Sequence, residues 1–351
     1  MIQQLLFRKS SPVISFFLFS SAVWAGDLSA LPDEIHQGIL AVNDNVFRED
    51  IDAAENEAKK IIRKNPDHPA GYFCMAFVID SWMVRYQSDE KENEFYRFCD
   101  LAIEKGEKIL TRKPKEEWAR FFIGGADGFK GTYEARYERW ITAFRYGWKG
   151  VSVLLDLQSS GCRIPDIDYG IGSYHYWRSA LMKMLWWMPG IEDKRKEGIE
   201  LLYKARSEGL YTKTSASVTL LDILLNEKQY EDALVIADEG LKQYPDAAAF
   251  IWGKARALYG LQRYAKAMPL LREMIRKTEL DDHDNHYNTT LYHFYMARIF
   301  LAEKKYIQAI AEYNLINNFS YESSVRKRLD ATFGELRNIN KRALQGMAKG
   351  K

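Results

Sequence analysis

Cysteine and proline are scarce in this chain, which has three cysteines and nine prolines among 351 residues. No Cys-x-x-Cys pair occurs, so the common zinc and redox motifs built on that spacing are excluded. The few prolines stand against 21 tyrosines and 18 phenylalanines, a balance that argues against a disordered chain. The composition therefore indicates a folded protein with a packed core.

Two of the cysteines, Cys74 and Cys99, fall on successive predicted helices. Their placement leaves two alternatives open. A disulfide bridge requires the two helices to bring the Cα atoms within about 7 Å. Otherwise these thiols and that of Cys162 are free, and they pack as small apolar side chains.

A strong charge of either sign is also missing, since the formal net charge is +2. Without the first 25 residues, which hold Arg8, Lys9 and no acid, 48 of the 50 basic residues remain against 48 acidic ones. Nucleic-acid binding depends largely on a basic field that neutralises phosphates. The sequence therefore predicts no nucleic-acid partner.

An apolar run broken only by serines lies near the N-terminus, from Val13 to Trp24. It is shorter than the roughly 20 residues that span a bilayer. It follows the basic pair Arg8 and Lys9 and ends beside the small residue Ala25, the pattern of a signal peptide. We expect cleavage after Ala25, a mature chain without a transmembrane segment, and a periplasmic or extracellular location.

Catalytic motifs are missing as well: the chain has no His-Glu-x-x-His, no Gly-x-Ser-x-Gly and no dinucleotide-binding fingerprint. Four glycines between Gly124 and Gly131 lie in a helical pattern that does not follow the order of a phosphate-binding loop. We predict instead that a neighbouring helix closely approaches Gly124 and Gly128. The chain is predicted not to be an enzyme and to need no cofactor.

What the sequence does contain is a repeat with a period of 34 residues. The segments 229–233 and 263–267 both place a tyrosine three residues before an alanine, Tyr230 with Ala233 and Tyr264 with Ala267. A third copy, with Tyr306 and Ala309, follows 42 residues after the second and implies an insertion at residues 281–288.

This pattern resembles the tetratricopeptide repeat family. The resemblance implies an all-α fold, a right-handed helical-repeat solenoid in which a small residue lies where the two helices of each repeat cross. Two positions depart from it, because Pro269 lies inside a predicted helix and Glu279 replaces a closing proline. The matching residues are Leu220, Leu221, Tyr230, Ala233, Ala237, Gly240 and Pro245 in one repeat, and Ala255, Tyr264, Ala267, Leu271 and Met274 in the next.

The resemblance weakens toward the N-terminus, where helices are predicted to be longer than repeats require. Ala54 marks a degenerate first repeat, and residues 169–214 resemble a segment that precedes such repeats in exported bacterial proteins. Single helices are predicted over 69–86, 91–111, 133–157 and 192–207, with another opening at 164–166. The predicted organisation is a signal peptide at 1–25, a degenerate helical-hairpin array at 26–210, repeats at 211–322, and a C-terminal helix with a basic tail at 323–351.

Members of this family usually bind ligands on the concave face of the first helices, which implies a protein or peptide partner and a scaffold function. Trp, Tyr and Arg dominate interface energetics, and Arg can bind a carboxylate. The alternative is that Trp252 and Tyr259 are core residues and that Arg256 pairs with Asp222. The candidate partner-binding residues are Asp222, Trp252, Arg256, Tyr259, Phe294 and Arg298.

An aromatic block at 169–187 has three interpretations: a core packed closely at Gly170 and Gly172, a pocket for an apolar or carbohydrate ligand, or a membrane-interface contact through residues 186–188. The pocket supports an alternative function, a solute-binding or transport-accessory protein. Its candidate residues are Tyr169, Tyr174, His175 and Trp177.

A cluster of acids and histidines at 281–286, with His293 beyond it, has the chemistry of metal ligands. The candidates are His283 and His286. A solvated insertion has the same composition, and the sequence does not predict a metal site.

Overall fold

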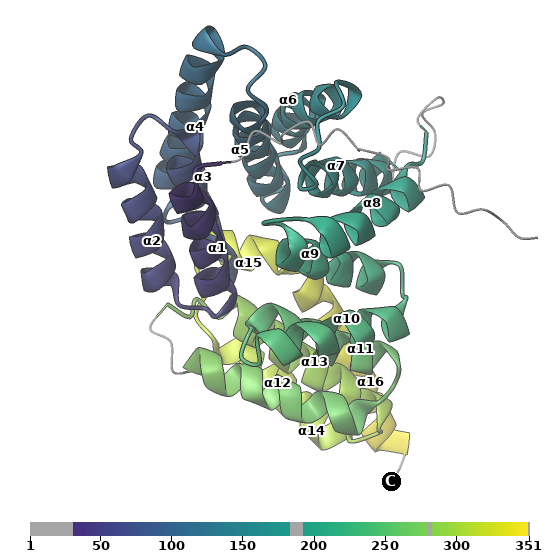
Figure 1. Cartoon of the computed structure of the whole chain (residues 1–351). Helices are drawn as coiled ribbons and strands as arrows, with labels where there is room; N and C mark the ends of the chain where they lie inside the picture. The colour runs from purple at the N-terminus through teal and green to yellow at the C-terminus, as the bar shows by residue number, and fades with distance from the viewer. Residues whose placement is uncertain (1–30, 183–191, 280–282, 350–351) are drawn as a thin grey trace, which may run out of the picture.

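The computed structural model describes residues 31–182, 192–279 and 283–349. Over these ranges the fold is all-α, without a strand (Figure 1). The helices are α1 Asp33–Phe47, α2 Ile51–Lys64, α3 Pro69–Tyr86, α4 Glu92–Arg112, α5 Glu117–Arg136, α6 Trp140–Ser159, α7 Ile167–Met182, α8 Arg195–Glu208, α9 Lys213–Asn226, α10 Tyr230–Gln243, α11 Ala248–Gly260, α12 Tyr264–Glu279, α13 Tyr287–Ala302, α14 Tyr306–Asn318, α15 Ser323–Arg328 and α16 Asp330–Lys349.

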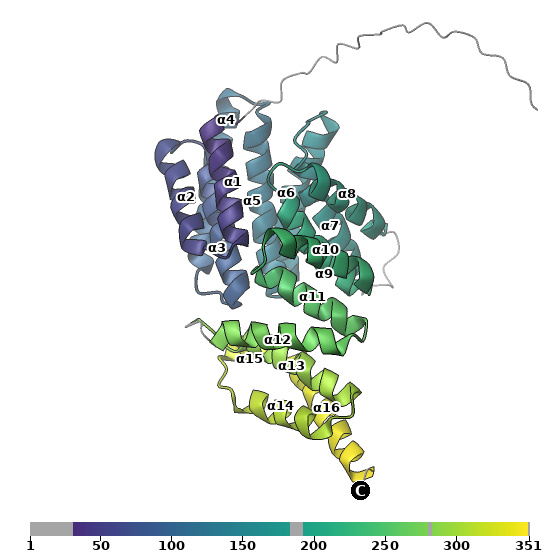
Figure 2. The same ribbon diagram turned by 60° about the horizontal axis from the view of Figure 1, so that its bottom comes forward.

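Consecutive helices pack as hairpins, from α1 with α2 through α13 with α14. The first helices of neighbouring hairpins also pack on one another, as α1 does on α3, α3 on α5 and α9 on α11. The last helix, α16, packs on both α13 and α14 and continues the stack (Figure 2). This arrangement confirms the predicted helical-repeat solenoid.

The six hairpin turns within the described residues share one backbone conformation. The turning residue has a left-handed φ between 52° and 64° although it is not glycine, a conformation that is uncommon for such residues. The residue after it donates its N–H to the carbonyl five positions back, as Arg263 does to Leu258 at 2.8 Å, which is the long bond of a Schellman motif. The turning residues are Glu49, Gln87, Glu138, Lys228, Gln262 and Lys304.

Small residues set the distance between the helices of a hairpin. Ala233, Ala267 and Ala309, the repeated alanines, are fully buried. Between α5 and α6 the contact is made by glycines: a Cβ on Gly150 would lie 2.6 Å from the Gly124 carbonyl oxygen and 2.7 Å from the Gly128 nitrogen. The predicted close approach at Gly124 and Gly128 is confirmed.

One predicted helix is wrong. Residues 133–157 do not form a single helix, because α5 ends at Arg136 and α6 begins at Trp140, with Glu138 in the left-handed turn. The helical spacing of apolar residues continues across this turn, and the turn contains neither glycine nor proline. The sequence therefore has no signal that marks the end of α5. Two starts also shift: α7 begins at Ile167 and α8 at Arg195.

The three cysteines are free thiols in the structure. Cys74 and Cys99 are buried, and burial raises the pKa of the Cys74 thiol to about 12. The structure therefore has no Cys74–Cys99 disulfide, and the thiols pack as apolar side chains, which was the second alternative.

The array curves until its first hairpins touch its last ones (Figure 1). The side-chain amides of Asn285 and Asn288 donate to the backbone carbonyls of Tyr86 (3.0 Å) and Arg85 (2.8 Å) at the end of α3. Nearby, Arg328 of α15 donates to the Gln87 carbonyl at 2.8 Å. The residues predicted as an insertion thus join the two ends of the array.

Candidate functional site: an arginine–aromatic strip on α9, α11 and α13

Side chains of alternating charge and aromatic character follow one another across the first helices of three successive repeats. We call them the arginine–aromatic strip. Because α9 packs on α11 and aromatic rings of α11 contact rings of α13, residues far apart in sequence meet. The strip consists of Asp222 on α9, Trp252, Arg256 and Tyr259 on α11, and Tyr295 and Arg298 on α13.

The first cation of the strip, Arg256, is held from two sides. Its Nη1 donates to Asp222 Oδ1 at 2.7 Å, and its guanidinium lies 5.6 Å from the Trp252 ring centroid. The Asp222 side chain is 51% exposed and that of Arg256 25%, so the ion pair contributes at most about 1 kcal/mol to stability. The predicted alternative, a pair between Arg256 and Asp222, is present in the structure.

The second cation, Arg298, has a different environment. Its guanidinium lies 4.8 Å from the ring centroid of Tyr259, 5.3 Å from Phe294 and 5.4 Å from Tyr295. In the described part of the chain it forms no ion pair with a carboxylate. A cation held over aromatic faces keeps its charge while its position is fixed, so Arg298 presents an oriented guanidinium with hydrogen-bonding capacity left for a ligand.

The aromatic rings of the strip contact one another edge to face. Trp252 and Tyr259 both contact Tyr295, with centroids 5.1 Å and 5.0 Å away, and Trp252 also contacts the buried Tyr292 at 5.0 Å. Edge-to-face pairs at these distances are favourable. Burial raises the pKa of the Tyr259 hydroxyl, which therefore stays protonated.

Most of the predicted partner-binding residues thus lie together, but Phe294 is only 5% exposed and lies among the core residues beneath Arg298. Tyr295 was not predicted. Its position, directly after Phe294, fell outside the inward positions taken from the repeat frame, and no periodic signal in the sequence identifies it.

The alternative pocket residues do not converge on one space. Tyr176, inside the same block, is fully buried, and its hydroxyl is bound by Glu227 and Asn226. His175 is buried beside Glu197, with 3.3 Å between Nδ1 and Oε1, and burial lowers the pKa of its imidazole.

Other members of the block face different neighbours. The Tyr169 hydroxyl lies 3.4 Å from Thr219 Oγ1 on α9, Tyr174 packs against α6, and Trp177 is exposed. The block is therefore largely core, as the first interpretation held. Residues 186–188 lie outside the described residues.

The two acids that precede His175 in sequence serve the fold. The Asp166 carboxylate accepts hydrogen bonds from the backbone N–H groups of Leu210, Tyr211 and Thr212 at 2.8–3.1 Å, and another from the Thr212 hydroxyl. Asp168 pairs with Lys204 at 2.8 Å. Neither reaches His175 as a catalytic partner would.

The histidines of the insertion, and His293 beyond it on α13, contact separate partners. His283 packs on the ring of Tyr86, His286 stacks on Phe319, and His293 Nδ1 lies 2.6 Å from Glu312 Oε2. Among the described residues there is no group of three or more His, Cys, Asp or Glu side chains placed to hold a metal ion. Asp281 and Asp282 lie outside the described residues.

A row of buried charges on α5 was missed by the sequence analysis. Asp127, Lys130 and Glu134 are each 5% exposed or less, and each has a partner on a neighbouring helix: Lys149, Asp100 and Tyr96 in that order. Burial raises the pKa of the Asp127 carboxyl. Their i, i+3, i+7 spacing on one helix face was the available signal. Because each is paired, the row joins α4, α5 and α6.

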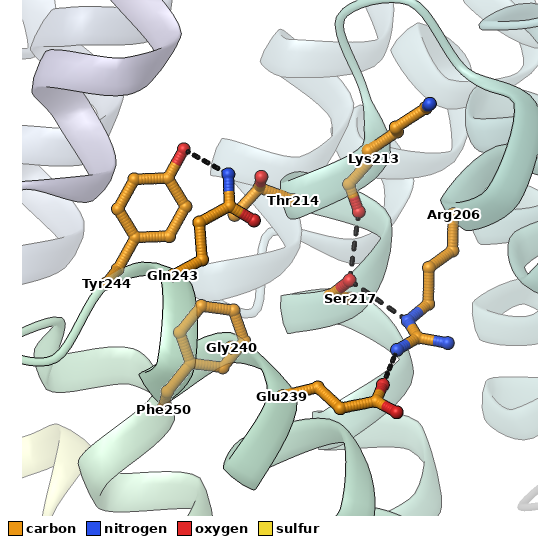
Figure 3. Close-up of a pocket in the computed structure, with 9 residues that line it drawn as sticks. All are labelled: Arg206, Lys213, Thr214, Ser217, Glu239, Gly240, Gln243, Tyr244 and Phe250. Carbon is orange, nitrogen blue, oxygen red and sulfur yellow. Dashed lines mark hydrogen bonds and ion pairs between the residues drawn. The ribbon is translucent and has the colours of Figure 1, made fainter.

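A surface cavity of about 420 Å³ lies between α8, α9 and α10 (Figure 3). Its polar groups bind one another: Arg206 pairs with Glu239, the Arg206 Nε donates to Ser217 Oγ at 3.2 Å, and Ser217 donates to the Lys213 carbonyl. No set of unpaired polar groups converges on it. It is lined by Arg206, Lys213, Thr214, Ser217, Glu239, Gly240, Gln243, Tyr244 and Phe250.

The stacked hairpins and the strip across their first helices define a helical-repeat protein. Residues 224–288 match the family model described as tetratricopeptide repeat. This match supports the predicted resemblance to the tetratricopeptide repeat family, and it covers the segment from the end of α9 to the start of α13.

The crystal structure of a tetratricopeptide repeat protein from Parabacteroides merdae is 13% identical, and the alignment covers 89% of this chain and 100% of that chain with a TM-score of 0.37. No curated protein matches the sequence. Over the described residues, no helix has the length and apolar content needed to cross a bilayer.

Proposed function

We propose that the protein is an exported scaffold whose arginine–aromatic strip binds a protein or peptide segment that presents a carboxylate. The observation that carries the proposal is Arg298, a guanidinium fixed over the rings of Tyr259, Phe294 and Tyr295 without a carboxylate partner in the described ranges. A ligand carboxylate can supply the charge-assisted hydrogen bonds that this cation lacks. The match of residues 224–288 to the tetratricopeptide repeat model supports the same general role, since such repeats commonly mediate protein interactions.

The neighbouring ion pair gives the strip a second contact point. The Asp222 carboxylate that holds Arg256 is half exposed, so a ligand acid can compete for Arg256, while Asp222 can accept from a ligand donor. Trp252 and Tyr295 lie between the two arginines and offer apolar contact area for the ligand backbone. The strip therefore fits an extended segment with an acidic group and an adjacent apolar side chain.

The test is affinity capture from the cell that makes the protein, comparing wild type with the double variant Arg256→Glu/Arg298→Glu. Loss of the specific partners is expected, because the reversed charges repel a carboxylate. The matched control is Arg272→Glu/Arg276→Glu, which reverses two exposed arginines on α12 and should leave the partners unchanged. Identical partners for wild type and the strip variant would remove the strip from the proposal.

Export is part of the proposal and rests on the sequence of residues 1–25 alone. The mature chain is expected to begin at Gly26. Intact-mass measurement of the protein recovered outside the cytoplasm tests this, and a mass that still includes residues 1–25 would contradict it.

A further inference from the structure

Large apolar side chains are exposed together on α6 and α7. We call Trp140, Ile141, Phe144, Trp148 and Trp177 the α6–α7 aromatic face. Ile141 is 89% exposed and Trp148 56%, far beyond the exposure of core residues. Within the ranges described, the three tryptophans of this face are the ones that are exposed; Trp82 and Trp118 are buried. Grouped exposure of this kind marks an interaction surface.

The face is continuous across the two helices. On α6, positions 140, 141, 144 and 148 follow helical spacing and share one side. Tyr174 of α7 joins them, with its ring 6.2 Å from Phe144 and 6.3 Å from Trp148, over the gap left by Gly147. Trp177 follows one turn later on α7.

Folding does not use this face. The buried residues of α6, Gly150, Val151, Leu154 and Leu157, lie in its C-terminal half, and the helix packs against α5 and α7. The exposed aromatic side chains are therefore an addition to a helix that is already anchored.

The charged residues closest to the face along α6 and α7 are basic. Residues 139–155 and 169–182 contain no Asp or Glu, and they contribute Arg139, Arg145, Lys149 and Arg178. Arg139 pairs with Glu92 and Glu134. Lys149 pairs with the buried Asp127, whereas Arg145 and Arg178 form no ion pair in the described structure. The nearest acids along the chain are Glu138 and Asp156, at the two ends of α6.

We propose that the α6–α7 aromatic face docks on the surface of a bilayer that contains anionic phospholipid. Tryptophan is enriched at the boundary between headgroups and acyl chains, where its ring is buried and its N–H stays hydrated. The arginines complement the negative surface of such a bilayer, and each basic residue near it increases binding about fivefold. This inference is independent of the proposed function of the strip.

Other occupants fit the face less well. A second copy of the chain would bring two basic rims together across a twofold axis, and like charges in close opposition disfavour that contact. An acidic protein partner satisfies the charge, but a row of tryptophans without neighbouring hydrogen-bonding carboxylates matches the lipid interface better. Both alternatives are outcomes of the experiment below.

The experiment is flotation of the purified full chain with phosphatidylcholine vesicles that contain or lack phosphatidylglycerol. Because residues 1–25 are themselves apolar, wild type and variants are compared with identical N-termini. Wild type should float with the anionic vesicles about tenfold more than with the zwitterionic ones at low salt, and less at high salt, since salt screens the attraction.

Two variants and their controls locate the contact. Ile141→Ser/Trp148→Ser should lower flotation with anionic vesicles about tenfold or more, whereas Val235→Ser/Ile307→Ser, which removes two apolar side chains of comparable exposure elsewhere, should not. Arg145→Glu should also lower it, and Arg272→Glu on α12 should not. Matching melting temperatures show that all four remain folded.

A measurement on the wild type alone gives an independent check. Phosphatidylglycerol brominated near the headgroup end of its acyl chains should quench tryptophan fluorescence, and the quenching should fall in Ile141→Ser/Trp148→Ser. Equal flotation with both vesicle types, or equal flotation of wild type and this variant, would overturn the proposal. Self-association of wild type, or binding of an acidic protein, that the variant loses while vesicles are not bound would assign the face to that occupant instead.

Discussion

At the residue scale, the repeated alanines show how one methyl group sets the packing of a hairpin. Ala233, Ala267 and Ala309 are fully buried at the same position of three repeats. These alanines were identifiable from sequence because the 34-residue period aligned them. Tyr295 was not, since its part in the strip depends on how α11 and α13 lie side by side, which no local pattern encodes.

Ala267→Leu is expected to lower the free energy of unfolding by about 1–3 kcal/mol, because the longer side chain overpacks the contact of α11 with α12. Its neighbour Lys266 is exposed, so Lys266→Leu should change stability by less than about 0.5 kcal/mol. Thermal unfolding measures both. Equal melting temperatures for the two variants would show that Ala267 does not lie at the crossing.

Another residue-scale effect concerns pH. His68 is held neutral at the start of α3, where its Nδ1 accepts from the Ala70 N–H at 3.2 Å, and burial lowers the pKa of its imidazole from 6.5 to about 4. Above pH 6.5 the imidazole is neutral in both states. Below it, the unfolded chain binds the proton first, so stability falls until about pH 4, where the folded protein also binds it.

Protonation of His68 in the unfolded chain is expected to lower the free energy of unfolding by about 2 kcal/mol at pH 5 relative to pH 7.5. His68→Asn keeps a side-chain acceptor at the start of α3 but does not titrate. Urea denaturation at the two pH values should therefore show a smaller difference for the variant than for wild type. The same difference in both proteins would mean that His68 is not the group responsible.

At the scale of elements, the glycines of α5 and α6 act as contact surfaces. Gly150 meets the Gly124 and Gly128 backbone directly, while a Cβ added at Gly128 would meet nothing within 4 Å. The sequence predicted the close approach, since four glycines in one helix needed a compensating contact. It did not predict where α5 ends, because a glutamate rather than a glycine makes the turn.

Alanine substitution at Gly150 and at Gly128 should therefore change the stability in opposite directions. Gly150→Ala should destabilise the protein by about 1–3 kcal/mol, since the methyl group would collide with backbone atoms that cannot rotate away. Gly128→Ala should stabilise it by about 0.5–1 kcal/mol through helix propensity. Chemical denaturation separates the two, and a stabilising Gly150→Ala would contradict the packing described for α5 and α6.

At the scale of the whole molecule, contact between distant ends distinguishes this array from an open one. The fold class and the 34-residue repeat frame could be predicted from the sequence, because both depend on local periodicity. The closure did not, since it depends on curvature summed over all the hairpins and on single polar side chains such as Asn285 and Asn288.

Arg328 is the residue by which this closure can be tested. Its guanidinium donates to the Gln87 carbonyl and lies 4.3 Å from the Tyr287 ring centroid and 5.1 Å from Tyr137. Arg328→Ala should cost about 1–3 kcal/mol and increase hydrogen exchange in residues 85–88 and 283–288 together. Arg276→Ala, on an exposed position of α12, is the control. Faster exchange in only one of the two segments would argue against a shared contact.

The closing contact also limits how this chain can change in evolution. Open repeat arrays lengthen when a repeat is duplicated, because each unit needs only its neighbours. Here one more hairpin inserted between α3 and α13 would separate Asn285 and Asn288 from the carbonyls of Tyr86 and Arg85. The contact therefore constrains the number of hairpins between these two helices, where new function is expected to arise by substitution on the exposed faces rather than by insertion of a repeat.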